Sequence, residues 1–245
     1  MKTYLLFRAL AIATLITYAI LRNGSQSNWL LDLVLFNSIA LFALISIFMS
    51  PIPDDSQGRL GIASAILLWT LGSFVSSLTS FFAIDEYFNL DLVADLSYSL
   101  FYPCALYGIS RSLLHRRVSK SLEILDTLII TLGFTTIVAT FLLRPAMSGL
   151  SGTRFEVFIE ILYPVGDVIL LISTVALTFL RSISLRSFLL LIGIFTYAIS
   201  DFYFLYLSER GSYQLGAATD MGWLLLIDKS HFLRDTKSKN QRVRK

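Results

Sequence analysis

The segment Val168-Ile169-Leu170-Leu171-Ile172 is apolar at every position, and so is Ala65-Ile66-Leu67-Leu68-Trp69. A strand of a membrane β-barrel instead alternates apolar and polar residues, because one face meets lipid and the other meets the lumen. Both segments lack this alternation, and each lies inside a longer apolar stretch. A helix satisfies its own backbone hydrogen bonds, so it is the structure expected for such a stretch in lipid. We therefore predict an all-α fold, a polytopic membrane helix bundle.

The composition of the chain supports a multi-pass membrane protein. Of its 245 residues, 55% are hydrophobic and 15% are charged, whereas about 25% of the residues of an ordinary soluble domain are charged. A helix rises about 1.5 Å per residue, so about 20 apolar residues cross a hydrocarbon core of about 30 Å. The sequence predicts eight spans, at residues 4–21, 29–49, 60–82, 92–114, 122–143, 157–180, 188–208 and 214–228. Asp228 interrupts the eighth, and whether it crosses the bilayer fully stays open.

The basic residues predict the orientation of these spans. With eight spans and a cytoplasmic N-terminus, sixteen of the 20 Lys and Arg residues lie on the cytoplasmic side, in accord with the positive-inside rule. We therefore expect a transmembrane helical domain at residues 1–228 and a basic cytoplasmic tail or linker at 229–245. Such a tail suits anionic membrane lipid as a partner and does not indicate nucleic-acid binding.

The first span also has the general form of a signal peptide, with basic residues ahead of an apolar run. However, the run ends in Leu21-Arg22 without a small-x-small cleavage site. We therefore expect it to be retained as a transmembrane helix. Its removal would leave the orientation of the other spans unchanged.

Polar side chains inside the spans are the best candidates for functional residues, because they are unfavourable in lipid. In the fourth and sixth spans three of them follow one another at i, i+3 and i+7, which places them on one face of a helix. The seventh span holds a pair four residues apart, and one further acid opens the eighth. The candidates are Asp95, Tyr98, Tyr102, Glu160, Tyr163, Asp167, Tyr197, Asp201 and Asp220.

These candidates allow two interpretations. They line an outward-opening polar cavity for a small ligand, a cation or protons, or they hydrogen-bond across the bundle and only stabilise it. We interpret Asp167 and Asp201, the deeper acids, as members of a buried polar network, and leave open whether this network binds a ligand. Asp32 and Asp126 lie near the starts of spans, where we expect their side chains to reach the membrane interface.

Catalytic and metal-binding patterns are missing from the sequence. The two histidines, His115 and His231, lie at inner span boundaries, and Cys104 is the single cysteine. A haem between helices needs His pairs within the spans, and neither a phosphate-binding loop nor a nucleophile elbow occurs. We therefore expect no enzymatic activity, no catalytic residue, no metal site and no cofactor.

Three motifs in the second half of the chain follow one another in a recognisable order. They are Leu162-Tyr163-Pro164-Val165-Gly166-Asp167, Ser200-Asp201-Phe202-Tyr203 and Asp220-Met221-Gly222-Trp223-Leu224-Leu225. Together with Leu125-Asp126 and Arg144-Pro145 upstream, this order resembles the multi-pass N-terminal membrane sensor region of bacterial GGDEF and GGDEF–EAL proteins. Those proteins make or degrade cyclic di-GMP. The resemblance covers about residues 60–228 and implies a part in sensor architecture, not catalysis, for Tyr163, Pro164, Asp167, Asp201, Asp220 and Trp223. We expect structural roles for Pro164, Gly166 and Trp223.

The resemblance implies a signal-input domain in the bacterial inner membrane, with both termini in the cytoplasm. Its expected partners are a GGDEF, EAL or kinase output domain, a second copy of the chain in a homodimer, and membrane lipid. No GGDEF or EAL sequence precedes Lys245, so we expect either a fragment or a stand-alone sensor domain. The alternatives are a small proton- or cation-coupled transporter, which also uses intramembrane carboxylates, and an assembly protein without a ligand.

Overall fold

The structure is a computed structural model of the whole chain. It describes residues 3–22, 27–50, 56–82, 89–114, 154–179, 185–210, 212–213 and 220–224, together with 129, 131–133, 136 and 140. Within these ranges every regular element is a helix and none is a strand. The predicted all-α helix bundle is therefore confirmed.

Six of the helices are long and apolar enough to cross a membrane, which indicates a membrane protein. They correspond to the first four predicted spans and to the sixth and seventh. The predicted span at 122–143, apart from the isolated residues named above, and the tail at 229–245 lie outside the described residues. Of the predicted eighth span the structure describes a short helical piece at 220–224. The elements are α1 (Thr3–Arg22), η1 (Leu30–Leu35), α2 (Phe36–Met49), α3 (Ser56–Phe82), α4 (Leu90–Leu114), α7 (Arg154–Phe179) and α8 (Leu185–Glu209).

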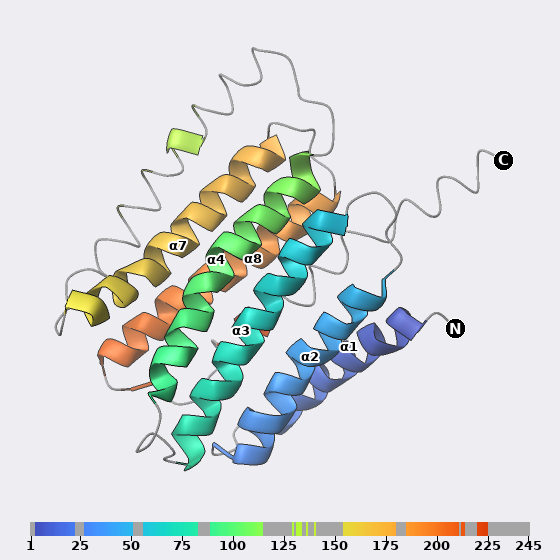
Figure 1. Cartoon of the computed structure of the whole chain (residues 1–245), viewed down its shortest axis with the longest axis vertical. Coiled ribbons are helices and arrows are strands. Elements are labelled where there is room, and N and C mark those ends of the chain that lie inside the picture. Colours follow the sequence, from blue (N-terminus) through green and yellow to red (C-terminus); the bar gives the residue numbers. More distant parts are fainter. Residues whose placement is uncertain are drawn as a thin grey trace.

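The six long helices pack with antiparallel neighbours except α4 and α7, which are parallel (Figure 1). Figure 1 shows α1 and α2 at one edge, α3 and α4 in the middle, α7 at the other edge, and α8 passing behind α4. Helices α1, α3 and α8 run one way, while α2, α4 and α7 run the opposite way (Figure 1). Direct packing joins α1 to α2, α2 to α3, α3 to α4, α4 to α7, and α7 to α8. These relative directions agree with those in the predicted topology.

Polar side chains on the helices bond largely to their own backbone. The hydroxyls of Thr14, Ser97 and Thr174 each donate to the carbonyl oxygen four residues earlier, at 2.7–2.8 Å. Each hydroxyl is thus hydrogen-bonded within its own helix and needs no partner on another helix.

Helices α4 and α7 each continue through a proline, Pro103 in α4 and Pro164 in α7. A proline inside a helix removes one backbone hydrogen bond, and in both helices it lies within three residues of a candidate site residue.

Helices α3 and α4 approach each other closely at two glycines. A Cβ atom on Gly61 would lie 2.8 Å from the Gly108 Cα, and one on Gly108 would lie 2.5 Å from the Ile62 backbone nitrogen. Small residues allow helix backbones to pack closely in lipid, where burial of apolar surface does not drive association. This contact was not predicted, because one glycine in each helix does not stand out among the other small residues of an apolar span.

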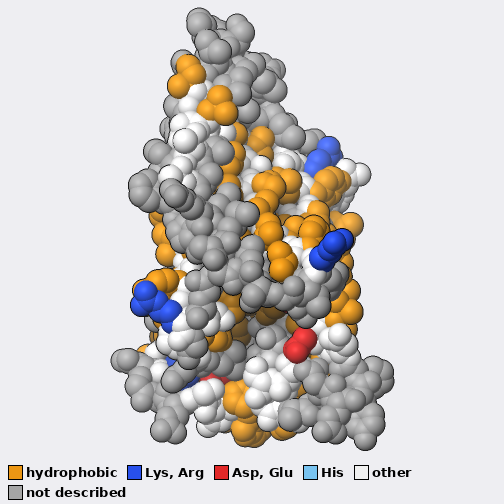
Figure 2. All heavy atoms as spheres, turned by 90° about the vertical axis from the view of Figure 1, so that its left-hand side faces the viewer, with side chains coloured by type: hydrophobic (Ala, Val, Ile, Leu, Met, Phe, Trp, Pro, Cys, Tyr) orange, Lys and Arg blue, Asp and Glu red, His pale blue; other side chains and the backbone are white. Residues whose placement is uncertain are grey.

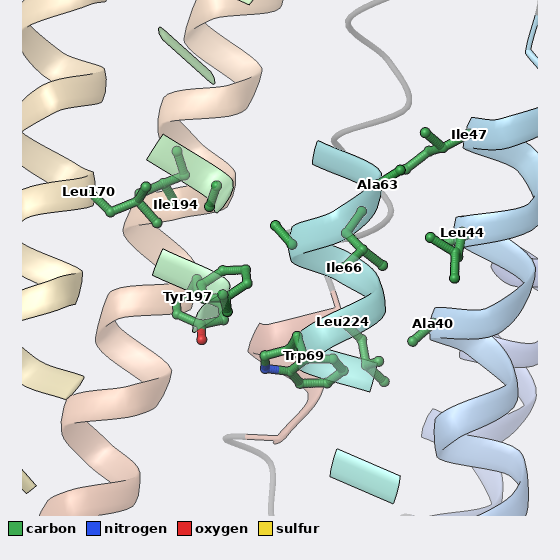
Figure 3. Packing of buried hydrophobic residues seen from close by; sticks show 14 of the residues in the cluster. Ala40, Leu44, Ile47, Ala63, Ile66, Trp69, Leu170, Ile194, Tyr197 and Leu224 are labelled. Carbon is green, nitrogen blue, oxygen red and sulfur yellow. The ribbon is translucent and has the colours of Figure 1, made fainter. Parts of the chain in front are cut away.

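The buried core runs through the middle of the bundle. In Figure 3, Leu170 of α7 lies with Ile194 and Tyr197 of α8 on one side, opposite Ile66 and Trp69 of α3. Figure 2 shows that many hydrophobic side chains also lie on the outside of the described helices. An exterior rich in apolar side chains is expected of helices that face lipid.

Candidate functional site

The centre of the site is the side chain of Tyr102 on α4, which reaches two acids on two other helices. Its hydroxyl lies 3.0 Å from Asp167 Oδ1 on α7 and 3.4 Å from Asp201 Oδ2 on α8. Tyr102 and Asp167 are buried, whereas Asp201 is partly exposed. We call these three residues the Tyr102 cluster. The predicted polar network around the two deep acids is present, and Tyr102 joins them.

A glycine makes room for this tyrosine. The ring of Tyr102 packs against Gly166, where a Cβ atom would be only 2.7 Å from the ring carbons Cγ and Cδ1. Gly166 directly precedes Asp167, so the position that admits the ring also brings the hydroxyl to the neighbouring carboxylate. This gives a physical basis for the structural role expected of Gly166.

Two further side chains adjoin the Tyr102 cluster. Tyr197, one turn before Asp201 on α8, is buried beside Tyr102 and packs against Phe101 with ring centroids 5.3 Å apart. The indole of Trp223 lies near the Asp201 carboxyl. Its Nε1 atom is buried and has no hydrogen-bond partner in the part of the chain that the structure describes. Trp223 therefore brings the 220–224 segment to the site.

A second tyrosine–carboxylate pair links α7 to the first turns of α4. The Tyr163 hydroxyl donates to Asp95 Oδ1 at 2.7 Å. The Tyr98 ring packs edge-on against the Tyr163 ring with centroids 6.3 Å apart. Two predicted candidates on α4 thus contact one on α7, and the contact ties the two helices together one to two turns from Tyr102.

A third polar cluster lies between α1 and η1 and corrects one prediction. Asp32 was expected to reach the interface, but it is buried with 2% of its surface exposed. It forms an ion pair with Arg22 at 3.1 Å and accepts a hydrogen bond from Tyr18 at 3.0 Å. Its other oxygen accepts from Ser27 Oγ and from the Asn28 backbone N–H. The prediction was wrong because a nearby arginine compensates the charge that would otherwise require water.

Asp220 belongs to a fourth contact. It is buried, and the Tyr213 hydroxyl donates to its carboxylate at 3.1 Å from Oδ2. Burial and the negative charge of Asp220 raise the pKa of the Tyr213 phenol above its ordinary value. Asp220 also lies close enough to Tyr18 and Tyr98 to influence them electrostatically. The Asp220 contact is therefore near the Asp32 group, through Tyr18, and near the Asp95 group, through Tyr98.

The candidate residues were expected to line a polar cavity, if they bind a ligand. In the structure Tyr102 instead lies within hydrogen-bonding distance of Asp167 and Asp201, and Tyr163 within that distance of Asp95. A cavity of about 40 Å³ does lie next to them, between α3, α4, α7 and α8, but its walls are apolar. Apolar cavities of this kind stay dry. Its lining residues are Ile62, Ala65, Ile66, Trp69, Phe101, Ala105, Ile109, Leu170, Leu190, Ile194 and Tyr197.

One predicted candidate stays untested, and two residues with polar contacts were not among the predicted ones. The backbone of Glu160 is part of α7, but its side chain lies outside the described part of the structure, as does Asp126. Tyr18 and Arg22 were not predicted as site residues. Arg22 follows the first predicted span and Asp32 lies near the start of the second. Opposite charges at the two ends of this short connection could have indicated the ion pair.

The site offers little to a metal ion. Among the described residues no group of three or more His, Cys, Asp or Glu side chains is arranged to hold one. Comparison of the chain with family models, with curated proteins and with solved structures finds no match.

Proposed function

We propose that this chain is a sensory input domain of the bacterial inner membrane. It would relay a stimulus from the outer side, or from within the membrane, to a cytoplasmic output domain or partner. The observation that carries this proposal is the position of Tyr102, which reaches Asp167 and Asp201 from a third helix. A change in the hydrogen bonds of the Tyr102 cluster would therefore alter the contacts of α4, α7 and α8 together.

The geometry supports a two-state mechanism. The Tyr102 hydroxyl has one hydrogen to donate and two carboxylates within 3.4 Å. Any stimulus that favours one carboxylate over the other as the acceptor changes the packing of α4 against α7 or α8. A stimulus shifts such an equilibrium only by its differential affinity for the two states. Trp223, near Asp201, connects this change to the last described segment of the chain.

The nature of the output rests on the resemblance of the three motifs to sensor regions of GGDEF and GGDEF–EAL proteins. We propose that the chain regulates cyclic di-GMP signalling, with both termini in the cytoplasm and with an active homodimer. Two of the resembling motifs contain Asp167 and Asp201, and the third contains Trp223. The residues that carry the resemblance thus belong to, or adjoin, one cluster.

A fusion of the full chain to a diguanylate cyclase domain tests this function. Tyr102→Phe and Asp201→Asn should change cellular cyclic di-GMP several-fold, because both alter the Tyr102 cluster. Tyr206→Phe and Asp91→Asn are matched controls at exposed positions on α8 and α4, and both should leave the output unchanged. Unchanged output from both site variants, at wild-type levels in the membrane, would refute the sensory function.

Transport of protons or cations is the second candidate, and the buried position of Asp167 favours it. Carboxylates within membrane helices also serve proton and ion pathways. Liposomes containing the purified chain and an entrapped pH indicator separate the two functions. A proton flux that Asp167→Asn abolishes would support transport, whereas tight liposomes together with a responsive cyclase fusion would support sensing.

A further inference from the structure

The two carboxylates of the Tyr102 cluster differ from Asp32 in how their charge is compensated. Asp32 has an arginine and three hydrogen-bond donors around it. Asp167 is buried as deeply, with 1% of its surface exposed. Its Oδ1 accepts from Tyr102, but its Oδ2 has no hydrogen-bond partner among the described residues. A buried carboxylate oxygen without a donor is strongly unfavourable.

The described groups that act on the Asp167 and Asp201 carboxyls, beyond each other, are the Tyr102 phenol and the Trp223 indole, and neither is positively charged. Helix α4 contributes Tyr102 and Tyr98, α8 contributes Asp201 and Tyr197, and the 220–224 segment contributes Trp223 and Asp220. On these elements the neighbours are phenols, an indole and further acids. The second pair on α4 and α7, Asp95 with Tyr163, adds another acid and another phenol.

Two unprotonated carboxylates at this position would repel each other. The side chains of Asp167 and Asp201 are near enough to interact directly, and two carboxyl groups that share a site cannot readily both be ionised. A single proton relieves both problems, because it removes one negative charge and gives Asp167 Oδ2 a hydrogen-bonding role.

We propose that Asp167 and Asp201 together bind one proton, held at Asp167 Oδ2 and shared with the Asp201 carboxyl. The bound proton lets α7 and α8 pack closely, and its loss leaves two like charges that push these helices apart. The proton site stands without the proposed sensory function, whereas its use as the stimulus rests on that function.

The environment also favours a proton over a metal ion and indicates a route to the site. Mg²⁺ and Ca²⁺ take about six to eight oxygen ligands, while the described cluster offers two carboxyl groups and a phenol. A proton needs only two oxygens. Asp201 is partly exposed and Asp167 is not, so the route of the proton to Asp167 leads by way of Asp201.

Infrared difference spectroscopy of the full chain in lipid nanodiscs, recorded as a function of pH, tests this proposal. We expect the C=O band of a protonated carboxylic acid, with a shift in D₂O, and its loss in Asp167→Asn. Asp91→Asn should retain the band. Tyr102→Phe keeps both carboxyl groups and should retain the band at a shifted frequency, which covers the case in which Asp167→Asn does not fold.

Two results would overturn the proposal. One is a wild-type spectrum without a pH-dependent carboxylic acid band that depends on Asp167. The other is a carboxylate signal that responds to Na⁺ at constant pH, since that would identify a metal cation as the ligand. If the band is present as expected but the cyclic di-GMP output of the cyclase fusion does not change with pH, the proton site stands. Only its proposed role as the sensory stimulus then fails.

Discussion

Gly166 lies against the ring of Tyr102 so closely that a Cβ atom at position 166 would be 2.7 Å from the ring carbon Cδ1. Gly166→Ala should therefore displace Tyr102 and lower the free energy of unfolding by about 1–3 kcal/mol, as overpacking does. Gly133→Ala is the matched control, because a Cβ atom there would have nothing within 4 Å. Unfolding by denaturant in detergent micelles measures both. Equal stability of the two variants would contradict the packing described.

Removal of the Tyr102 hydroxyl should also be destabilising. In Tyr102→Phe the buried Asp167 carboxylate loses the donor to its Oδ1, and a buried acceptor without a donor costs about 1–3 kcal/mol. Tyr203, with 51% of its surface exposed on α8, provides the control. Thermal unfolding should place Tyr203→Phe at the wild-type midpoint and Tyr102→Phe clearly below it. A midpoint for Tyr102→Phe at the wild-type value would show that the hydrogen bond contributes nothing.

The ion pair between Arg22 and Asp32 should behave as a buried pair. Loss of one partner leaves an uncompensated buried charge, so Arg22→Gln should destabilise the chain by about 3–5 kcal/mol. The double variant Arg22→Gln with Asp32→Asn should recover part of this loss. Arg154, an exposed arginine at the start of α7, gives the control change Arg154→Gln, which should have little effect. Additive losses in the double variant would show that the two residues do not interact.

The cavity next to Tyr197 should make its walls sensitive to truncation. Ile194 is 1% exposed and lines this cavity, so Ile194→Ala enlarges an existing void and should cost about 2–5 kcal/mol. Ile199 lies on the same helix but is 48% exposed, and Ile199→Ala should cost much less. Unfolding in detergent compares the two variants directly. A similar loss in both would indicate that the cavity region repacks after truncation.

Tyr213 should contribute a pH dependence at the alkaline end. Its pKa is raised above the ordinary 10.0 by burial and by Asp220, so the folded chain keeps the phenol neutral. The unfolded chain ionises above pH 10, so the stability that Tyr213 contributes is present below this pH and falls as the pH rises beyond it. Tyr213→Phe should lose less stability than wild type between neutral and strongly alkaline pH. Tyr206→Phe, at an exposed position, should follow wild type, and parallel curves for all three chains would refute the assignment.

Much of the fold could be predicted because the bilayer sets a length and a polarity for each helix. The six described spans match predicted ones, and the face that carries Tyr98 and Tyr102 was identified from spacing alone. Spacing along one helix does not, however, identify the partner on another. That Tyr163 pairs with Asp95, and that Tyr102 serves both deep acids, follows from how the helices pack.

The remaining errors share a physical origin. Asp32 was expected at the interface because a lone carboxylate near a span end is most stable in water. Its burial depends on Arg22, which precedes it in another helix. Gly61 and Gly108 were not singled out, because a glycine allows close helix packing only where a second helix crosses, and the sequence does not show where that is. Contacts between residues of two different helices cannot be predicted from the residue pattern of one span.

The pairing of Arg22 with Asp32 also constrains how the protein is assembled. One charge ends α1 and the other lies in η1, so each is compensated only when these two segments stand next to each other. The charges at the junction of the first two helices therefore cancel only when both segments are in place. A version of the chain without α1 would leave the Asp32 carboxylate without both Arg22 and the Tyr18 hydroxyl, so α1 is needed to bury the start of the second span.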